Sequence, residues 1–356
     1  MVIGIYIRSL AKGGAEKQAI LLAKHLIPSY ETKLIVLYEE GELIEKAFQE
    51  IPGNSIFFTR GNNFLAKALS LYGILRYNKV DTLICYLPSN NITGIIIGKL
   101  ARVGRVYGGI RSSKIKANRL KMFIQKFLMN NIAAGVVSNS YVGKMSYSNY
   151  GVREEKIHVI HNGIELHNQW HSRMEKPYIS IISVGRFVEE KDYLTALKAI
   201  LSLVQRTRLK SKSIHYVIAG YGELEKGIRQ YISSNRLEKY VSLKINPPDI
   251  ASLYEKADIF LMTSVYEGMP NAVMEAMSWS LPVVATNAGD TSYLVLNGHN
   301  GYLCNIGDSD DIADKLDILV KDFTHRNNLG KNGYRHLQES FSTNSLKNKY
   351  IELIKK

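Results

Sequence analysis

Short apolar runs alternate with helical patterns along nearly the whole chain of 356 residues. Short apolar runs between turn signals are typical of buried strands, and longer patterns of helical periodicity are typical of amphipathic helices. Regular alternation of the two predicts parallel sheets with helices on both faces, which is an α/β fold. Because a chain of this length usually forms two domains, we expect two such sheets.

The predicted elements fall into two groups, one in each half of the chain. In the first half the predicted strands are Val2–Ile7, Leu34–Tyr38, Ser55–Phe58, Thr82–Tyr86, Val106–Ile110, Gly135–Ser138 and a run ending at Ile160, with helices ending near Ile27 and over 42–50, 64–78, 90–102 and 117–131. In the second half the predicted strands are Tyr178–Val184, His215–Ala219, Val241–Ile245, Ile259–Met262, Pro282–Ala285 and Tyr302–Cys304, with helices over 193–204, from about 271, and through most of the last 40 residues.

The boundary between the two groups is expected just after Asn162-Gly163, where about fifteen polar residues follow, including His167, His171 and Pro177. Such a composition is typical of a linker. The spacing of its histidines fits no common metal-ligand pattern, so we interpret them as solvated linker residues. We therefore expect one domain over residues 1–165 and a second over 166–340. A C-terminal helix over 341–356 would follow, and its return to the first domain stays an open possibility.

The cysteines and the lengths of the apolar runs indicate the cellular compartment to expect. The two cysteines, Cys85 and Cys304, lie in apolar strand-like runs. We interpret them as buried free thiols, and no disulfide framework is implied, which fits a reducing compartment. No secretory signal pattern is visible near Val2–Ile7, and the apolar runs are too short to span a bilayer. The expected location is cytoplasmic, with peripheral attachment to the inner face of the plasma membrane left open.

Positive charge is concentrated in the first half. Of the net charge of +14, residues 1–165 contribute most, with 22 Lys and Arg against 11 Asp and Glu. Between Asp81 and Glu154 there are 11 Lys and Arg and no acidic residue. A block of one sign favours an anionic partner, such as a membrane surface or a nucleic acid.

The stretch from Ser264 to Ala276 predicts an anion site in the second half. It follows the apolar run Ile259–Met262, turns at Glu267-Gly268, and starts a helix in which Pro270 suits the first position. Free amides and the helix dipole at such a terminus attract phosphate. The carboxylates of Glu267 and Glu275 lie on either side of this site, an arrangement that suits the hydroxyls of a nucleotide sugar.

Other candidate residues follow neighbouring predicted strands. Arg186 and Lys191 come just after Tyr178–Val184, and Gly220 and Gly222 come after the next strand. Ligands bind at the carboxyl edge of parallel sheets, where two cations could neutralise a departing diphosphate without a metal. Each feature alone has a plainer interpretation, because loop cations are usually solvated and paired glycines usually form turns. Gly13-Gly14 after the first strand is another anion-ready turn, with a tight turn as its plainer interpretation.

Taken together, these motifs resemble the retaining glycosyltransferases of family 4, also described as glycosyl transferases group 1. The motifs that carry the resemblance are Gly13-Gly14-Ala15-Glu16, Ile160-His161-Asn162-Gly163, Val184-Gly185-Arg186 with Glu190-Lys191, Gly220-Tyr221-Gly222, Ala257-Asp258, Glu267 and Glu275 with seven residues between them, Pro282 to Thr286, and Asn297-Gly298 with Asn300-Gly301. Their order and spacing cover most of the chain and are far more specific than any one motif.

The resemblance implies the GT-B fold, in which two Rossmann-like domains face each other across a cleft. The second domain would bind the donor and the first the acceptor. It also implies a retaining, metal-independent transferase without a cofactor that moves a sugar from a nucleotide diphosphate, with UDP as the expected nucleotide, to a glycan. The resemblance implies a lipid-linked acceptor, in bacterial surface polysaccharide assembly. Guanosine diphosphate stays open as the nucleotide, as does the choice between a hexosyl and an N-acetylhexosaminyl group.

The resemblance further implies roles for individual residues. Arg186 and Lys191 would hold the phosphates, and Glu267 would contact the hydroxyls of the donor sugar. Glu275 would accept hydrogen bonds from the ribose. Further donor contacts would come from Gly14, Gly220, Gly222, Gly268, Met269, Asn271 and Ala272. Arg111, at a strand end of the first domain, is expected to contact a phosphate of the donor or of the acceptor.

The basic stretch 99–131 is the candidate membrane contact. Over residues 114–131, a helix would gather Leu120, Phe123, Ile124, Phe127 and Leu128 into an apolar stripe among basic residues. This pattern is typical of an interfacial helix on anionic lipid. The alternative is an ordinary helix whose stripe faces the core and whose basic face is solvated.

Two other functions stay open on the sequence alone. One is a sugar-nucleotide epimerase on a related fold, which the Glu267 and Glu275 element with Arg186 and Lys191 disfavours. The other is a nucleic-acid-binding protein, suggested by the charge. The aromatic and basic interleaving expected for single strands is thin, and no recognised binding module is present. We therefore expect no nucleic-acid partner.

Overall fold

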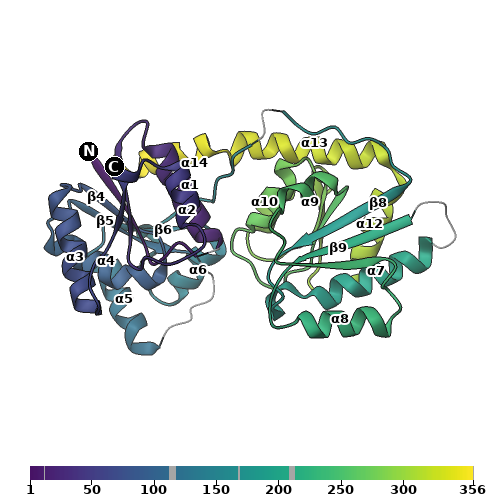
Figure 1. Cartoon of the computed structure of the whole chain (residues 1–356), viewed down its shortest axis with the longest axis horizontal. Coiled ribbons are helices and arrows are strands. Elements are labelled where there is room, and N and C mark those ends of the chain that lie inside the picture. The colour runs from purple at the N-terminus through teal and green to yellow at the C-terminus, as the bar shows by residue number, and fades with distance from the viewer. Residues whose placement is uncertain (12, 112–117, 167–168, 208–212, 356) are drawn as a thin grey trace. The chain divides into compact units, whose positions relative to one another are not determined.

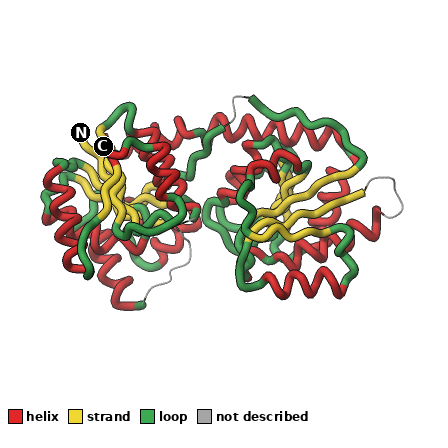
Figure 2. The backbone as a smooth tube through the Cα atoms, in the orientation of Figure 1, coloured by secondary structure: helices red, strands yellow, loops and turns green. Residues whose placement is uncertain are grey.

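The computed structural model describes residues 1–11, 13–111, 118–166, 169–207 and 213–355 (Figure 1). The chain forms two compact units. Unit 1 comprises Met1–Gly163 and Thr343–Lys356, and unit 2 comprises Ile164–Ser342. Each unit has strands at its centre and helices on both sides (Figure 2). Two parallel sheets of this kind confirm the α/β fold expected from the sequence.

Unit 1 is built on a seven-stranded parallel sheet in the order β3-β2-β1-β4-β5-β6-β7. Its strands are β1 (Val2–Ile7), β2 (Glu31–Val36), β3 (Ile56–Phe58), β4 (Thr82–Cys85), β5 (Arg105–Ile110), β6 (Gly135–Ser138) and β7 (Ile157–Val159). Its helices are α1 (Gly14–Leu26), α2 (Ile44–Glu50), α3 (Phe64–Tyr77), α4 (Pro88–Leu100), α5 (Arg119–Asn131), α6 (Tyr141–Asn149) and α14 (Thr343–Lys355).

Alternate residues of the central strands of unit 1 enter two separate cores. Ile3 and Ile5 pack with α1, α2 and α14 on one face, whereas Tyr6 and Leu83 pack with α3, α4 and α5 on the other. Both faces are therefore covered, which explains why these strands are apolar throughout. The C-terminal helix α14 packs with unit 1 although residues 164–342 separate the two in sequence.

Unit 2 has a six-stranded parallel sheet in the order β10-β9-β8-β11-β12-β13. Its strands are β8 (Tyr178–Val184), β9 (Ser213–Gly220), β10 (Val241–Ile245), β11 (Ile259–Met262), β12 (Val283–Thr286) and β13 (Gly301–Cys304). Its helices are α7 (Tyr193–Thr207), α8 (Glu225–Ser234), α9 (Ala251–Lys256), α10 (Asn271–Ser278), α11 (Thr291–Leu294), α12 (Ser309–Lys321) and α13 (Phe323–Ser340). One core joins α7, α8 and α12, and the other joins α9, α10 and α13.

The strand orders fix where a ligand edge lies in each unit. In unit 2 the order reverses between β8 and β11, and in unit 1 it reverses between β1 and β4. In open parallel sheets, ligands bind beyond the carboxyl ends of the strands at such a switch point. The loops after β8 and β11 are therefore where a ligand is expected to bind in unit 2.

The structure also bears on the cysteines and on the lengths of the apolar helices. Cys85 and Cys304 are buried free thiols, as predicted, and burial raises the pKa of both well above the ordinary value. Among the described residues, no helix is both long enough and apolar enough to cross a membrane. Residues 114–117 of the predicted helix 114–131, and His167 of the linker, lie outside the described residues.

Candidate functional site

The site in unit 2 centres on an ion pair between two residues singled out in the sequence. Lys191 lies in the loop after β8, and Glu267 lies in the loop after β11. Lys191 Nζ is 2.6 Å from Glu267 Oε1, and the side chains are 22% and 12% exposed. The two loops thus meet at the switch point, and they place a cation and a carboxylate together at the edge of the sheet.

Backbone contacts hold these two loops against each other. The Val265 amide donates to the carbonyl of Glu190 at 2.9 Å. The Thr263 hydroxyl lies 3.1 Å from the carbonyl oxygen of Lys191 and 2.9 Å from that of Asp192. These bonds fix the backbone near both residues, so the positions of Lys191 and Glu267 do not depend on their ion pair alone.

Glycines allow the strand ends to approach closely at this edge. A Cβ atom added at Gly220, the last residue of β9, would lie 1.8 Å from the carbonyl oxygen of Gly185. Gly289 has a φ of +61°, and a Cβ atom there would lie 2.2 Å from the carbonyl oxygen of Glu267. Gly289 is followed by Asp290, whose amide donates to the carbonyl of Gly268 at 2.9 Å. The loop after β12 therefore supports the turn that carries Glu267.

Helix α10 begins directly after this turn. Pro270 is its N-cap residue, with φ −77° and ψ 104°, so the expectation that it takes the first helical position is wrong by one residue. Proline has no side-chain oxygen that could cap a helix, and its ring fixes the entry of the chain. The side chain of Met269 is buried in the core, whereas Asn271 and Ala272 are partly exposed. The backbone amides at the start of α10 thus lie beside side chains that are partly exposed to solvent.

Glu275 lies one turn into α10 and is half-buried. Its Oε2 accepts a hydrogen bond from the hydroxyl of Tyr254 on α9 at 3.1 Å. Burial, and then the nearby Glu275 carboxylate, raise the pKa of Tyr254 well above its ordinary value, so the phenol keeps its proton. Tyr254 was not singled out in the sequence.

The remaining predicted residues of unit 2 also lie along the ligand edge. Arg186 is exposed in the loop after β8, and Gly222 follows β9. The structure therefore brings together Arg186, Lys191, Gly220, Gly222, Glu267 and the start of α10 from three neighbouring strand ends. Among the described parts of the chain, no cluster of three or more His, Cys, Asp or Glu side chains could hold a metal ion.

Two predicted residues belong to unit 1. Gly14 begins α1 after β1, at the switch point of that sheet. Arg111 follows β5, where its guanidinium stacks on the Tyr86 ring with 3.9 Å to the ring centroid. Its Nη2 donates to the Tyr350 hydroxyl on α14 at 2.6 Å, and its Nε donates to the Tyr86 carbonyl. Arg111 therefore also fastens the C-terminal helix to the sheet, which its sequence position does not reveal.

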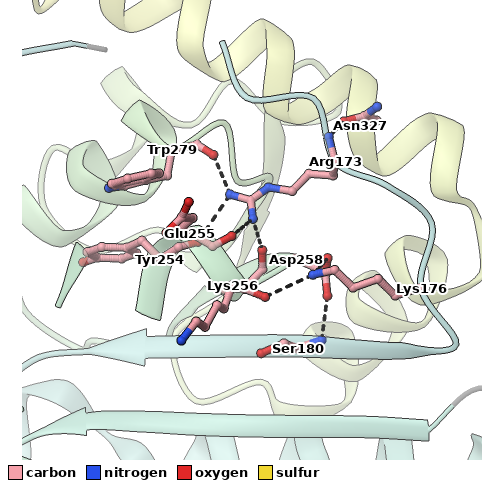
Figure 3. A network of polar contacts seen from close by, with 10 residues as sticks. Arg173, Lys176, Ser180, Tyr254, Glu255, Lys256, Asp258, Trp279 and Asn327 are labelled. Carbon is pink, nitrogen blue, oxygen red and sulfur yellow. Dashed lines mark hydrogen bonds and ion pairs between the residues drawn. The ribbon is translucent and has the colours of Figure 1, made fainter. Parts of the chain in front are cut away.

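The segment before β8 departs from the expected solvated linker. Arg173 donates to main-chain carbonyls at the ends of α9 and α10, and Lys176 forms an ion pair with the buried Asp258 at 3.3 Å (Figure 3). The amide of His171 donates to the Ser280 hydroxyl. This part of the segment is anchored on unit 2 because its polar side chains meet carbonyls and carboxylates of that unit. Local composition alone gave no signal of these contacts.

Comparison with known proteins identifies the family. The family model Glycosyltransferase Family 4 matches residues 12–168, and the model Glycosyl transferases group 1 matches residues 165–336. One curated relative is an α-1,4-N-acetyl-D-galactosaminyltransferase of Campylobacter jejuni, named for an undecaprenyl-diphosphate-linked glycan, with 24% identity over 99% of this chain and 98% of its own. Another is an Escherichia coli α-1,3-galactosyltransferase named for UDP-Gal and a diphosphoundecaprenol acceptor, with 25% identity over 80% of this chain and 79% of its own.

A solved structure gives the same fold. Anabaena HepE in complex with UDP superposes with a TM-score of 0.85 at 19% identity, over all of both chains. Two family models thus account for consecutive parts of the chain, and the structural match agrees with them. The chain belongs to the glycosyltransferases of family 4 and has the GT-B fold.

Proposed function

We propose that this glycosyltransferase is a retaining, metal-independent enzyme that moves a sugar from UDP to a lipid-linked glycan during assembly of a bacterial surface polysaccharide. The observation that carries the proposal is the Lys191–Glu267 pair beside the start of α10. Cation, carboxylate and helix N-terminus together suit a sugar diphosphate. The relatives named for undecaprenyl-diphosphate-linked glycans support the acceptor class, and the UDP bound to HepE supports the nucleotide.

In the proposed reaction, Arg186 and Lys191 bind the diphosphate together with the backbone amides of Gly268, Met269, Asn271 and Ala272. Glu267 binds hydroxyls of the donor sugar, and Glu275 binds the ribose. The bond between the anomeric carbon and the phosphate oxygen breaks, and the acceptor oxygen bonds to the same face of that carbon. The departing phosphate oxygen takes the acceptor proton. Arg111 contributes a phosphate contact in addition to its bonds to Tyr86 and Tyr350.

A nucleotide panel tests the donor. We expect UDP and one UDP-sugar to raise the melting temperature, because a ligand at one hundred times its Kd stabilises the folded state by about 2.7 kcal/mol. GDP and GDP-sugars at the same concentration serve as the control for the base. Radiolabel transfer to an undecaprenyl-diphosphate-linked glycan, with and without EDTA, then tests the acceptor class and metal independence. The anomeric configuration of the product, read by NMR, tests retention.

Peripheral membrane binding through unit 1 is the second part of the proposal. Four residues of the predicted stripe on α5 face outward, with Leu120 67%, Phe123 60% and Phe127 53% exposed and Ile124 also exposed. Leu128 is buried, so the core-facing alternative holds for this one residue of the stripe. The buried face of α5 uses Met122, Gln125, Leu128 and Met129 instead. Most of the stripe is thus available to a lipid surface.

The outward apolar residues continue onto the neighbouring helices. Helices α3, α4 and α5 cover the same face of the sheet of unit 1. Leu65 and Leu69 on α3 and Leu100 on α4 are exposed. From Ile51 to Arg153 the only acidic residue is Asp81, so this face carries basic residues among its exposed apolar ones. Such a surface complements an anionic bilayer, where each basic residue contributes about 1 kcal/mol.

A double substitution tests this surface. Phe123→Ser with Phe127→Ser is expected to lower binding to vesicles of phosphatidylglycerol and phosphatidylcholine at least tenfold, because both rings lose their apolar insertion. Co-sedimentation at physiological salt measures the effect. Phe48→Ser is the matched control, since Phe48 is a similarly exposed phenylalanine on α2, on the other face of the sheet. Equal binding of the double variant and the unaltered protein would contradict the proposal.

A further inference from the structure

Tyr254, on α9, connects α9 with α10, two of the helices that cover one face of the sheet of unit 2. Its side chain is 2% exposed, and its hydroxyl lies 3.1 Å from Glu275 Oε2 and 3.4 Å from the Ala272 carbonyl oxygen. A phenol has one proton to donate, and the charged acceptor at the shorter distance forms the stronger bond. The hydroxyl of Tyr254 therefore fixes one oxygen of Glu275.

Arg173 joins the same two helices at their C-terminal ends (Figure 3). Its Nη1 donates to the carbonyls of Glu255 and Ala257, and its Nη2 lies 3.3 Å from the Tyr254 carbonyl and 2.7 Å from the Trp279 carbonyl. The first three acceptors lie at the end of α9, and Trp279 is the C-cap residue of α10. Helix ends carry unpaired carbonyls and partial negative charge, so one guanidinium satisfies both ends.

We propose that Tyr254 is a positioning residue that holds Glu275 ready to receive the ribose hydroxyls of the donor, and that Arg173 holds the helix of Tyr254 against α10. This inference rests on the proposed role of Glu275 in the transferase. A glutamate that is ordered before the nucleotide arrives loses less conformational entropy on binding. Tyr254 therefore favours ribonucleotides over nucleotides whose sugar lacks hydroxyls.

The test compares UDP with its dideoxyribose analogue by isothermal titration calorimetry. In the unaltered protein, we expect UDP to bind at least about tenfold more tightly than the analogue, since a carboxylate left without its hydroxyl partners is penalised. In Tyr254→Phe, we expect the Kd for UDP to rise about fivefold and the Kd for the analogue to change less than about twofold, because only the ribose contact is disturbed.

Tyr216→Phe is the matched control. Tyr216 is a fully buried tyrosine on β9 of unit 2, and its hydroxyl is 2.7 Å from the hydroxyl of Ser183 on β8. Tyr216→Phe removes a buried tyrosine hydroxyl, as Tyr254→Phe does. It therefore measures how far the loss of such a hydroxyl destabilises unit 2. We expect it to leave the preference for UDP over the analogue unchanged. Urea unfolding of both variants verifies that the unit stays folded.

A second pair of variants tests the connection through Arg173. Arg173→Met is expected to reduce the preference for UDP at least about threefold, because α9 then shifts relative to α10. Lys176→Met is its control in the same segment, since the Lys176 ammonium is bonded to the Lys256 carbonyl at the end of α9 and to the Asp258 carboxylate just before β11. We expect this control to keep the preference while losing comparable stability.

The outcomes separate the inference from the proposed function. An unchanged Kd for UDP in Tyr254→Phe, or equal weakening for both nucleotides, would overturn the positioning role and leave the transferase proposal intact. Equal affinity of the unaltered protein for both nucleotides would also overturn the inference, because the ribose hydroxyls would then contribute nothing to binding. Failure of the unaltered protein to bind UDP or any nucleotide sugar would overturn the proposed function and the inference together.

Discussion

Glu267→Ala is expected to lower kcat about a thousandfold while unit 2 stays folded, because it removes a charged contact that the donor sugar needs in the transition state. The bonds from the Val265 amide and the Thr263 hydroxyl to main-chain carbonyls of the loop after β8 remain in the variant, so the turn keeps its place. Initial rates at saturating donor, measured by radiolabel transfer, give the effect.

Glu275→Ala is the matched comparison, because it removes a second carboxylate from the same site, one turn into α10. We expect it to raise the KM for the donor about tenfold and to change kcat less than about threefold, since a ribose contact is made equally in the ground state and the transition state. Glu267→Gln, which keeps the shape of the side chain, separates charge from volume. Unaltered activity in both alanine variants would contradict the assignment of the two glutamates.

The strands were the most predictable part of the fold. The apolar run Ile259–Met262 forms β11 with the predicted bounds, and Tyr178–Val184 forms β8 in the same way. Strands buried on both faces are mostly apolar, so their sequence signal is strong. Helices α6 and α8 were not predicted. Helix α6 is rich in serine, glycine and asparagine, and it is fixed by Ser140, whose hydroxyl accepts from the Gly143 amide. Poor helix formers of this kind give little periodic signal.

The sequence predicted which residues of unit 2 gather at the carboxyl edge of its sheet, but not the contacts that they make there. Lys191 and Glu267 were assigned separate roles, and their ion pair follows only from the neighbouring places of β8 and β11 in the sheet. The contribution of Tyr254 could not be seen, because a tyrosine on a short helix is ordinarily a core residue. On α5, Met122 and Phe123 are adjacent apolar residues that face opposite ways. Packing against α4 and β6 decides between the faces, and periodicity alone does not.

Lys191→Met is expected to lower kcat about a hundredfold, because the ammonium group would no longer neutralise the charge that builds on the departing phosphate. Lys198→Met is the control, since Lys198 is an exposed lysine on α7 in the same unit. Both variants remove one positive charge, so a general electrostatic effect on donor approach would appear in both.

The ion pair makes the Lys191 prediction sharper. The Lys191 ammonium is paired with Glu267 Oε1, and a bound diphosphate must share or replace that contact. Glu267 therefore offsets part of the attraction between Lys191 and the donor in the ground state. The additional negative charge that builds on the phosphate in the transition state is attracted without this offset. The Kd for UDP in Lys191→Met should therefore rise by a smaller factor than kcat falls. If kcat stayed within about threefold of the unaltered enzyme while Kd rose strongly, Lys191 would be a binding residue only, and Arg186 would be left as the cation that stabilises the leaving group.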